Sequence, residues 1–535
     1  MRPAFVGGVS LLVLALAFCP ASLAQGPAGD ADWDRCVKAP TRACILDEAL
    51  LRALSIGPTA SRQLGEIAEA QASAGNLQTA LRIAHSIPSN QRPRVTALRS
   101  IARAQASVGL ANEAKATFIE AHQLAAALVD QLDGAEALLS IAQAEAETGM
   151  AAEATFAESL QRAEAVKMRA GPTCEISRLP ERQLDSLLKA LAQQQAMSGN
   201  ISEALRIARS IRYDPIIRAE ALRAIGEVQA RSGGQSEAGQ ILKEAMEAAR
   251  AAQMPRENWP SCPGMRFVTS PESYAEALCM ISEAQAKTGR TEDAASTLEL
   301  ALQSIPAIKD DALWKAEVSR SLVLSAIAEA QSEVGLKPQS EATFERAAQM
   351  ASEVREPKHR VMALTRLARA RYKARETDAA GTFDDALALA RGLEKSFERA
   401  DGLLGVVQAK ADLGLTNDAI PILIQALAAT RSIPDKFARV LLLQRIAKAQ
   451  QNAGRLQDGA ATYTEALDAL DTAEDVQGRS QRANSLFMLI RSWPGQPQDT
   501  KLIALTASQM VRIADSINEK WRPEALVLIA KALPN

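Results

Sequence analysis

The chain has 535 residues, with 61 Lys and Arg against 63 Asp and Glu, and only 4% of its residues are aromatic. This length exceeds one ordinary globular core, so we expect several domains or an extended array. The balanced charge gives no indication of a nucleic-acid or anionic-membrane partner, which would need a concentrated basic face, and few aromatics with abundant Ala and Leu favour closely packed helices over a β-rich fold.

The N-terminal segment has the three parts of a secretory signal peptide. Arg2 supplies a positive charge, an apolar run of 13 residues occupies positions 6–18, and "SLA" at 22–24 fits the small-x-small cleavage rule. The run is shorter than the roughly 20 residues that span a bilayer as a helix. We therefore expect cleavage near Ala24, an exported chain that is periplasmic or secreted, and no membrane span. The alternatives are an uncleaved anchor and a lipid on Cys19, where the bulky preceding residue departs from the bacterial lipoprotein pattern.

Residues 25–60 are predicted to form an N-terminal cap closed by a disulfide. Cys36 and Cys44 bracket "VKAPTRA", in which Pro40 can end a helix and bring the two thiols together. Export permits such a bond, and it would stabilise the fold by about 2–3 kcal/mol in the chain-entropy model.

Three other cysteines remain after cleavage. Cys174 and Cys262 each lie in an insertion that contains Pro and Gly, and they form a second candidate pair. Cys279 lies within a helical pattern and is expected to be a small buried thiol. None has the CxxC spacing of a zinc site or a redox centre.

A sequence pattern recurs ten times within residues 61–475. The copies align on a turn residue, with Ile, Leu or Val eight positions earlier, Leu eleven positions earlier and a small residue five positions later. These offsets place the apolar residues on one helical face, and a glycine ends a helix at least cost in the left-handed conformation. Each copy therefore predicts a helix, a tight turn and a second helix. The turn residues are Gly75, Gly109, Gly149, Gly199, Gly233, Gly289, Gly335, Arg375, Gly414 and Gly454.

Arg375 is the exception, so its turn is expected to close differently or to bear strain. After the array, residues 476–535 fit one or two degenerate units followed by a capping helix.

The repeat resembles the tetratricopeptide repeat (TPR). The resemblance rests on the 34-residue spacing from Gly75 to Gly109 and from Gly199 to Gly233, on the Leu-x-x-Ile-Ala sequence and on the small residue after the turn. It covers roughly residues 61–475 and is divergent, because other spacings run from 39 to 56 residues and Gln often replaces the usual aromatic four residues before the glycine. It implies an all-α, right-handed superhelical solenoid of about ten TPR-like hairpins with capping helices at both ends.

The repeated glutamines have two interpretations. They could offer a ladder of amides to an extended peptide, or they could satisfy backbone and side-chain groups between neighbouring helices. We favour the second interpretation. The residues are Gln71, Gln105, Gln195, Gln229, Gln285, Gln331 and Gln450.

In TPR proteins the first helices line the concave surface, and the resemblance implies that a partner binds there. The position two residues after the repeated Ile or Leu is expected to face this groove. It carries Glu227, Glu283 and Glu329 in the middle of the array, with Arg103 and Arg369 on the flanks. These five residues are candidates for contact with a basic or mixed-charge peptide, and the alternative is an ordinary solvated helix surface.

No motif indicates catalysis, a metal or a cofactor. His85, His122 and His359 lie in separate repeats, and no Gly-rich phosphate loop, HExxH or GxSxG sequence is present. The sequence therefore predicts a non-enzymatic scaffold or adaptor of the bacterial cell envelope that binds a protein or peptide along its groove.

Two other functions are considered. A solenoid that senses a small ligand, such as a glycan fragment, would bind it near the insertions at 168–182 and 254–271, with Trp259 as a stacking residue. An accessory domain of a cell-wall-cleaving enzyme would need a globular catalytic domain, for which no segment outside the array is left. The sequence leaves open the partner, the oligomeric state and whether the array closes on itself.

Overall fold

The computed structural model describes residues 30–169, 179–252, 270–310, 315–473, 480–493 and 500–533. Within these ranges the regular structure consists of helices, without a β-strand. None of the helices there combines the length and the apolar character that a membrane crossing needs. The expected leader at 1–24, the cysteines Cys174 and Cys262, and Trp259 lie outside the described residues.

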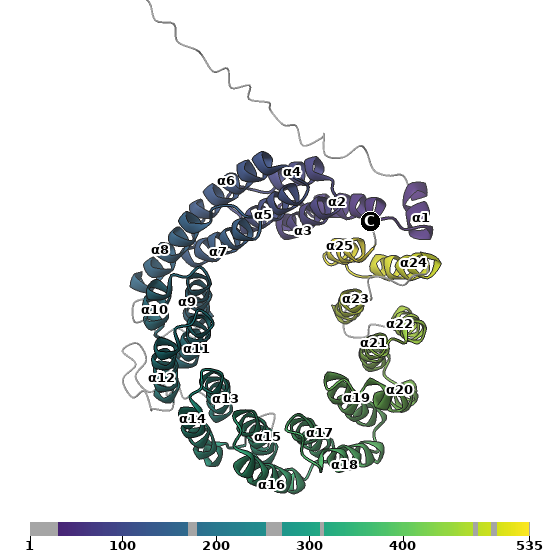
Figure 1. The fold of residues 1–535 in the computed structure, drawn as a ribbon. Helices are drawn as coiled ribbons and strands as arrows, with labels where there is room; N and C mark the ends of the chain where they lie inside the picture. Colours follow the sequence, from purple (N-terminus) through teal and green to yellow (C-terminus); the bar gives the residue numbers. More distant parts are fainter. Residues whose placement is uncertain are drawn as a thin grey trace, which may run out of the picture.

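The helices form two concentric layers of a ring (Figure 1). The inner layer consists of α3 (Ser61–Ser73), α5 (Arg92–Ser107), α7 (Gln131–Glu147), α9 (Leu179–Met197), α11 (Pro215–Arg231), α13 (Pro271–Lys287), α15 (Ala316–Val334), α17 (Pro357–Lys373), α19 (Ser396–Asp412), α21 (Lys436–Asn452), α23 (Ser480–Ser492) and α25 (Arg522–Ala532).

The outer layer follows the second helix of each hairpin. It consists of α4 (Leu77–Ser86), α6 (Ala111–Ala127), α8 (Glu153–Arg169), α10 (Ile201–Ser210), α12 (Gln235–Ala251), α14 (Thr291–Ser304), α16 (Lys337–Glu353), α18 (Ala379–Arg391), α20 (Thr416–Arg431), α22 (Leu456–Asp471) and α24 (Thr500–Ser516). The N-terminal helices are α1 (Asp30–Lys38) and α2 (Arg42–Ile56), and short 3₁₀ helices occupy Gly57–Ala60 and Ile305–Ala307.

The turn between the two helices of a hairpin is closed as the glycines predict. At the end of α5, the N–H of Gly109 donates to the carbonyl of Ala106 at 3.1 Å, and the N–H of Leu110 donates to the carbonyl of Gln105 at 3.0 Å. This Schellman arrangement satisfies the last carbonyls of the helix and requires a positive φ, which is 84° at Gly109. The other predicted turn glycines have φ values from 75° to 91°.

Arg375 takes the place of the glycine without changing the turn. Its φ is 61°, and the N–H groups of Arg375 and Glu376 donate to the carbonyls of Tyr372 and Arg371 at 3.0 and 2.9 Å. The turn therefore closes in the usual way and bears the strain of a left-handed residue with a side chain. The Arg371 side chain is buried and reaches Asp378, Glu345 and Thr382, so it ties the α17/α18 hairpin to α16.

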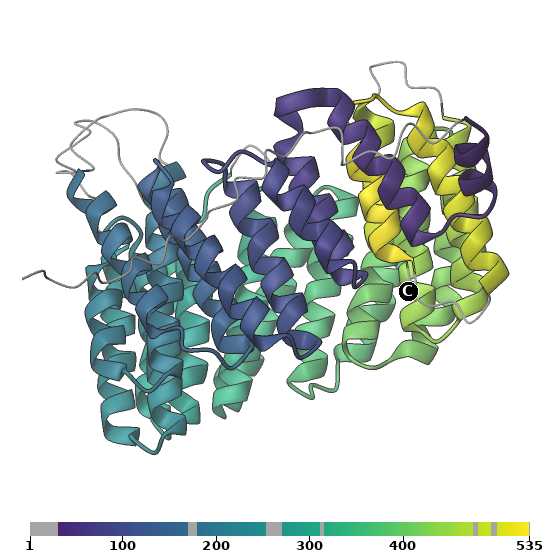
Figure 2. The same cartoon turned by 90° about the horizontal axis from the view of Figure 1, so that it is seen from above.

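The first and last helices that the structure describes lie side by side and close the ring (Figures 1 and 2). Helix α25 lies between α23 and α3 in the inner layer, and α2 packs along α25 as extensively as α4 packs along α3. Helix α2 thus acts as the second helix of a hairpin whose first helix is α25. The last unit of the ring is built from the two ends of the chain, which answers the question of closure that the sequence leaves open.

Polar contacts span the same junction. Arg62 of α3 pairs with Glu524 of α25 at 3.3 Å, and Lys531 of α25 lies 3.5 Å from Glu69 of α3. Outside these helices, α1 packs on α24. The terminal helices, expected to cap the two ends of the array, therefore contact each other.

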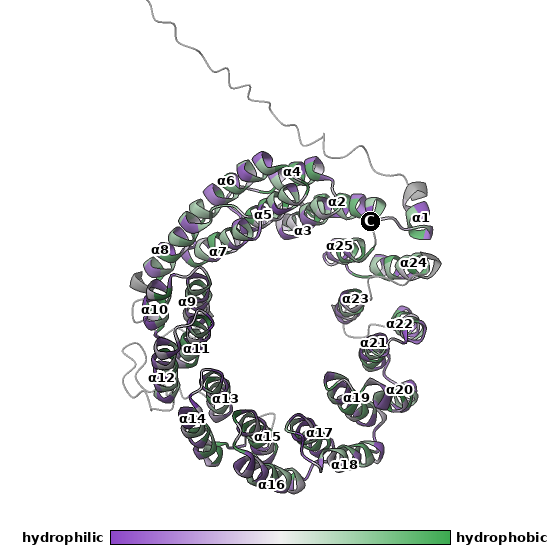
Figure 3. Ribbon diagram, viewed as in Figure 1, coloured by the Kyte–Doolittle hydropathy of each residue, from purple (hydrophilic) through white to green (hydrophobic). Residues whose placement is uncertain are grey.

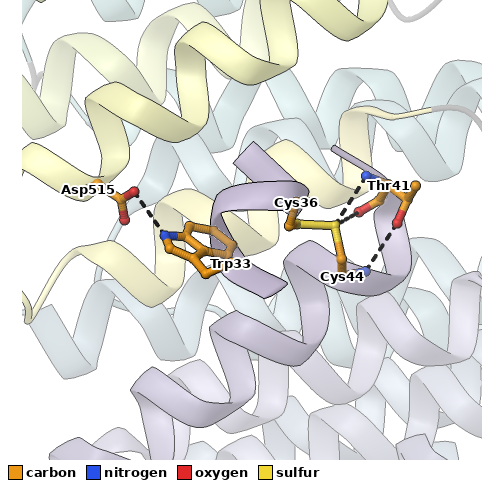
Figure 4. Close-up of a disulfide and its surroundings, with 5 residues drawn as sticks. All are labelled: Trp33, Cys36, Thr41, Cys44 and Asp515. Carbon is orange, nitrogen blue, oxygen red and sulfur yellow. Dashed lines mark hydrogen bonds between the residues drawn. A yellow bond between two sulfur atoms is a disulfide. The ribbon is translucent and has the colours of Figure 1, made fainter. Parts of the chain in front are cut away.

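The predicted disulfide between Cys36 and Cys44 is present, with an S–S distance of 2.01 Å (Figure 4). It fixes α1 to the start of α2, where the Thr41 hydroxyl accepts a hydrogen bond from the N–H of Cys44 at 3.3 Å. Cys279 is a free, buried thiol, as expected.

The apolar core runs between the two layers and is shared by successive hairpins. One cluster joins residues of the N-terminal units to residues of the C-terminal units, for example Leu46 and Ile67 with Leu526 and Ile529, and two further clusters continue around the ring. Figure 3 accordingly shows hydrophobic and hydrophilic residues in both layers all round the ring. Burial is thus spread over many small contacts between units, as in other solenoids.

A ladder of polar pairs follows the outer layer. A basic residue near the end of one outer helix pairs with a glutamate on the next outer helix of the chain, which holds neighbouring units in register. The pairs are His85–Glu120 at 3.1 Å, His122–Glu158 at 2.9 Å, Arg209–Glu244 at 2.8 Å and Arg431–Glu465 at 2.7 Å.

Candidate functional site

The inner helices carry the five residues predicted to face a partner, and the structure brings three of them into one sector. Glu283 of α13 and Glu329 of α15 line the same cavity. Arg369 of α17 lines the neighbouring cavity. Glu227 and Arg103 lie elsewhere on the ring. Glu227 pairs with Arg223 of its own helix at 2.6 Å, and Arg103 of α5 pairs with Glu147 of α7 at 2.8 Å.

Ion pairs between neighbouring inner helices neutralise much of the inner face. A cation on one helix meets a carboxylate on the next helix around the ring, so these charges are already satisfied within the protein. The pairs include Arg92–Asp133 at 2.7 Å, Arg103–Glu147 at 2.8 Å, Lys189–Glu220 at 2.7 Å, Lys373–Glu329 at 2.5 Å, Lys531–Glu69 at 3.5 Å and Arg445–Asp401.

The α13/α15 cavity departs from this pattern. It has a volume of about 440 Å³, and Met280, Leu322, Val323 and Ala326 give it an apolar lining. Three carboxylates that also line it, Glu272, Glu276 and Glu283, form no ion pair with any described residue. Burial, followed by the charge of nearby Glu333, raises the pKa of Glu283. This cavity therefore holds three carboxylates outside any ion pair, with the guanidinium of Arg366 in the same lining.

The α17/α19 cavity adjoins it and is larger, at about 650 Å³. Its apolar lining includes Met362 and Phe397, and its charged lining comes from both helices. Arg366 of α17 lines both cavities, so the two adjoin each other on the inner face. A third cavity, of about 490 Å³, lies between α7 and α9. The volumes fall within the range of about 300–1,000 Å³ that is usual for ligand sites.

Arg366, Met280 and Gly405 were not predicted from the sequence, although a signal for them exists. They occupy the position one residue before the repeated Ile, Leu or Val. This is three residues before the position that was expected to face the groove. Positions three apart lie on the same face of a helix. Both positions therefore belong to the stripe that faces the inside of the ring.

Five of the seven repeated glutamines are buried, which argues against a ladder of amides, and Gln195 and Gln229 are half-buried. Gln71, Gln105, Gln285, Gln331 and Gln450 are buried beside the turns between inner and outer helices. The Oε1 atom of Gln71 accepts from Asn76 Nδ2 at 2.8 Å, and Oε1 of Gln285 accepts from the Thr297 hydroxyl at 2.8 Å. The structural interpretation fits Gln71, Gln195 and Gln285, whereas the Oε1 atoms of Gln105, Gln331 and Gln450 are buried without a hydrogen-bond donor.

His85 and His122 belong to the outer ladder, and His359 lies near the start of α17. His85 and His122 bind glutamates of the next outer helix, and His359 lies 3.0 Å from Glu356. Among the described residues, no group of three His, Cys, Asp or Glu side chains is arranged to hold a metal ion.

No model of a known protein family matches the chain, and no curated protein matches it. Solved structures with some likeness include nearly identical TPR-like repeats assigned to a kinesin light chain of Podosopora anserina, at 16% identity, covering 38% of this chain and 99% of that chain with a TM-score of 0.24. Naa15/Naa10 bound to HypK-THB shares 14% identity over 91% of this chain and 77% of that chain, with a TM-score of 0.27. A Rap protein complexed with competence and sporulation factor shares 13% identity over 73% of this chain and 99% of that chain, with a TM-score of 0.23.

At these identities and TM-scores, the likenesses do not indicate a function for this chain. The description of the chain as a divergent TPR-like solenoid rests on its own helical hairpins, its glycine turns and its shared core.

Proposed function

We propose that this divergent TPR-like ring is a non-enzymatic scaffold that binds a protein or peptide on its inner face. The observation that carries the proposal is the sector from α13 to α19. Two adjoining cavities with apolar linings lie there, and Arg366, Glu272, Glu276 and Glu283 in their linings form no ion pair among the described residues. An apolar floor with unpaired charges at its edge suits a partner that supplies both apolar and charged side chains.

We further propose that the protein works outside the cytoplasm, in the periplasm or as a secreted component of a bacterial cell envelope. The leader pattern at residues 1–24 supports this location. The Cys36–Cys44 disulfide is compatible with it, because such bonds persist in oxidising compartments.

Site-specific photo-crosslinking in the native host tests the binding face. A crosslinking amino acid replaces Glu283, Glu329 or Arg369 one at a time, and Ser296, exposed on the outer helix α14, is the control. We expect one recurrent protein adduct from the inner positions and none from Ser296. Adducts of equal yield from Ser296 would show that the contact is not specific to the inner face, and the absence of adducts at all three inner positions would contradict the scaffold.

The second candidate function is the sensing of a small ligand. The volume of the α17/α19 cavity, about 650 Å³, favours it. The insertions and Trp259 that suggested this function from the sequence lie largely outside the described residues, so the cavity is now its only support in the described part of the chain. A small ligand would protect the α17/α19 cavity from solvent without producing a protein adduct at Glu283.

A further inference from the structure

The α17/α19 cavity has an aromatic floor that the protein leaves open. The Phe397 side chain is 38% exposed, although aromatic side chains are normally buried in a core. Met362 lines the cavity with it. At Gly405, also in the lining, a Cβ atom would meet nothing within 4 Å. The floor is therefore apolar and is not obstructed from the α19 side.

Two guanidinium groups at the edge of this floor have hydrogen-bonding capacity to spare. No residue in the described ranges forms an ion pair or a hydrogen bond with Arg366, and the buried Nε of Arg369 forms a long ion pair of 3.9 Å with Asp412 but no hydrogen bond. The two arginines are three residues apart on α17, so they lie on the same face of the helix.

The carboxylates that line the cavity are engaged with other groups. Asp401 pairs with Arg445, and Glu398 binds Lys395 at 3.0 Å. Asp412 accepts from the amide of Gln408 at 2.7 Å and forms the long ion pair with Arg369. A carboxylate that arrives from outside would therefore meet Arg366 without displacing an internal partner. Such charge-assisted bonds to arginine are short and frequently bidentate.

The adjoining α13/α15 cavity limits how much negative charge this ligand can carry. Glu272, Glu276 and Glu283 lie on its wall without ion pairs among the described residues, so a second acidic group on that side would be repelled. The site therefore fits a single carboxylate. Arg366 also lines the α13/α15 cavity, and Arg445 of α21 lines the opposite side, so the α17/α19 cavity has a neighbouring inner helix in each direction.

We propose that the α17/α19 cavity binds an extended protein segment in which one Asp or Glu adjoins an aromatic or large aliphatic residue. The carboxylate binds Arg366 and Arg369, and the apolar side chain packs on Phe397 and Met362. This inference rests on the proposed scaffold function and adds the position on the ring and the chemistry of the partner. The lining extends toward the α13/α15 cavity on one side and to Arg445 of α21 on the other, which favours an internal segment over a chain end.

The test begins with a random dodecapeptide library displayed on phage, selected against the full chain. The enriched peptide is then synthesised with an amidated C-terminus, together with a twin in which the acidic residue is replaced by its amide. Fluorescence anisotropy measures both peptides against the unchanged protein, Arg366→Gln, Phe397→Ala and the control Arg346→Gln, whose arginine is exposed on the outer helix α16.

We expect the acidic peptide to bind the unchanged protein and the Arg346→Gln control at least about tenfold more tightly than its twin, and this ratio to fall to about one in Arg366→Gln. Phe397→Ala should weaken both peptides equally. A consensus without an acidic residue, or a ratio that survives Arg366→Gln, overturns the inference while the scaffold stands. A twin whose binding is restored by a free C-terminal carboxylate also overturns it.

Failure to enrich any sequence would contradict the peptide-binding function itself, so the two failures are distinguishable. The comparison of a peptide with its twin on the unchanged protein needs no variant. It therefore decides the role of the carboxylate even where Arg366→Gln does not fold.

Discussion

The indole Nε1 of Trp33 donates a hydrogen bond of 3.1 Å to Oδ2 of Asp515, across 482 positions of the sequence (Figure 4). Trp33 lies on α1 and Asp515 on α24, so this bond joins the first helix to the last outer helix. It reinforces the composite unit of α25 and α2, which closes the ring by the same packing that builds every other hairpin. Closure is therefore a repeat interaction made between the two chain ends.

The composite unit predicts that a single buried residue of α25 controls closure. Leu526 is fully buried in the cluster that both ends share, so Leu526→Asp places an unpaired charge in that core at a cost of several kcal/mol. We expect the ring to open at α2/α25 and the radius of gyration from small-angle X-ray scattering to increase. Lys531→Ala is the control on the same helix, since it removes only a partly exposed ion pair worth less than about 1 kcal/mol. An unchanged radius for Leu526→Asp would show that α25 is not needed for closure.

The disulfide is predicted to hold α1 and not the ring. Replacement of Cys36 and Cys44 by Ser removes about 2–3 kcal/mol of stabilisation in the chain-entropy model, and α1 then depends on Trp33 and its contacts with α24. Hydrogen exchange monitored by mass spectrometry should become faster in residues 30–38, while exchange in α2 and α25 stays the same. Equal acceleration in α25 would mean that the disulfide itself maintains closure.

The hairpins could be predicted from the sequence because their signals are local. The Leu-x-x-Ile stripe and the turn glycine act within one unit, and they predicted the turns at Gly109 and its equivalents. The stripe of residues that faces the inside of the ring could also be predicted from the sequence. Glu283 and Glu329 belong to this stripe on neighbouring units, and they share a cavity. A single position of the repeat does not reveal the residues that neutralise Glu227 and Arg103, namely Arg223 and Glu147.

Closure could not be predicted in the same way. It depends on a small rotation between successive units, and the error in each rotation accumulates around the ring. The outer ladder, by contrast, has a signal in the sequence, since a basic residue is followed one repeat later by Glu at His85, His122, Arg209 and Arg431. His85 and His122 belong to this ladder, and catalytic motifs in the sequence give no sign of it.

The strained turn at Arg375 predicts a stabilising substitution. A side chain in the left-handed region costs roughly 1–2 kcal/mol, and glycine removes this cost while losing some entropy in the unfolded state. Arg375→Gly should therefore raise the melting temperature, with a net gain of about 1 kcal/mol. The reverse change at an equivalent turn, Gly335→Arg, should lower it. Equal melting temperatures in Arg375→Gly and the unchanged protein would contradict strain at this turn.

We expect Asp185 to lower the free energy of unfolding of the ring as the pH rises. This side chain of α9 is 1% exposed, and its Oδ2 accepts the N–H of Asp214 at 2.6 Å, at the start of α11. Burial raises the pKa of Asp185 to about 6, against the opposing effect of backbone N–H donors. The folded chain therefore holds this proton more tightly than the unfolded chain, whose carboxyl has the ordinary pKa of 3.8.

The contribution of the protonated Asp185 is fully present below pH 3.8 and is lost as the pH rises through about 6. Asp185→Asn keeps a neutral side chain whose oxygen can still accept from Asp214, and it removes the titration. Melting temperatures measured from pH 4.5 to 7.5 should fall less in the variant than in the unchanged protein, with a difference on the order of 2 kcal/mol over this interval. Because every other titrating group is common to both proteins, parallel curves would show that Asp185 does not titrate in this range.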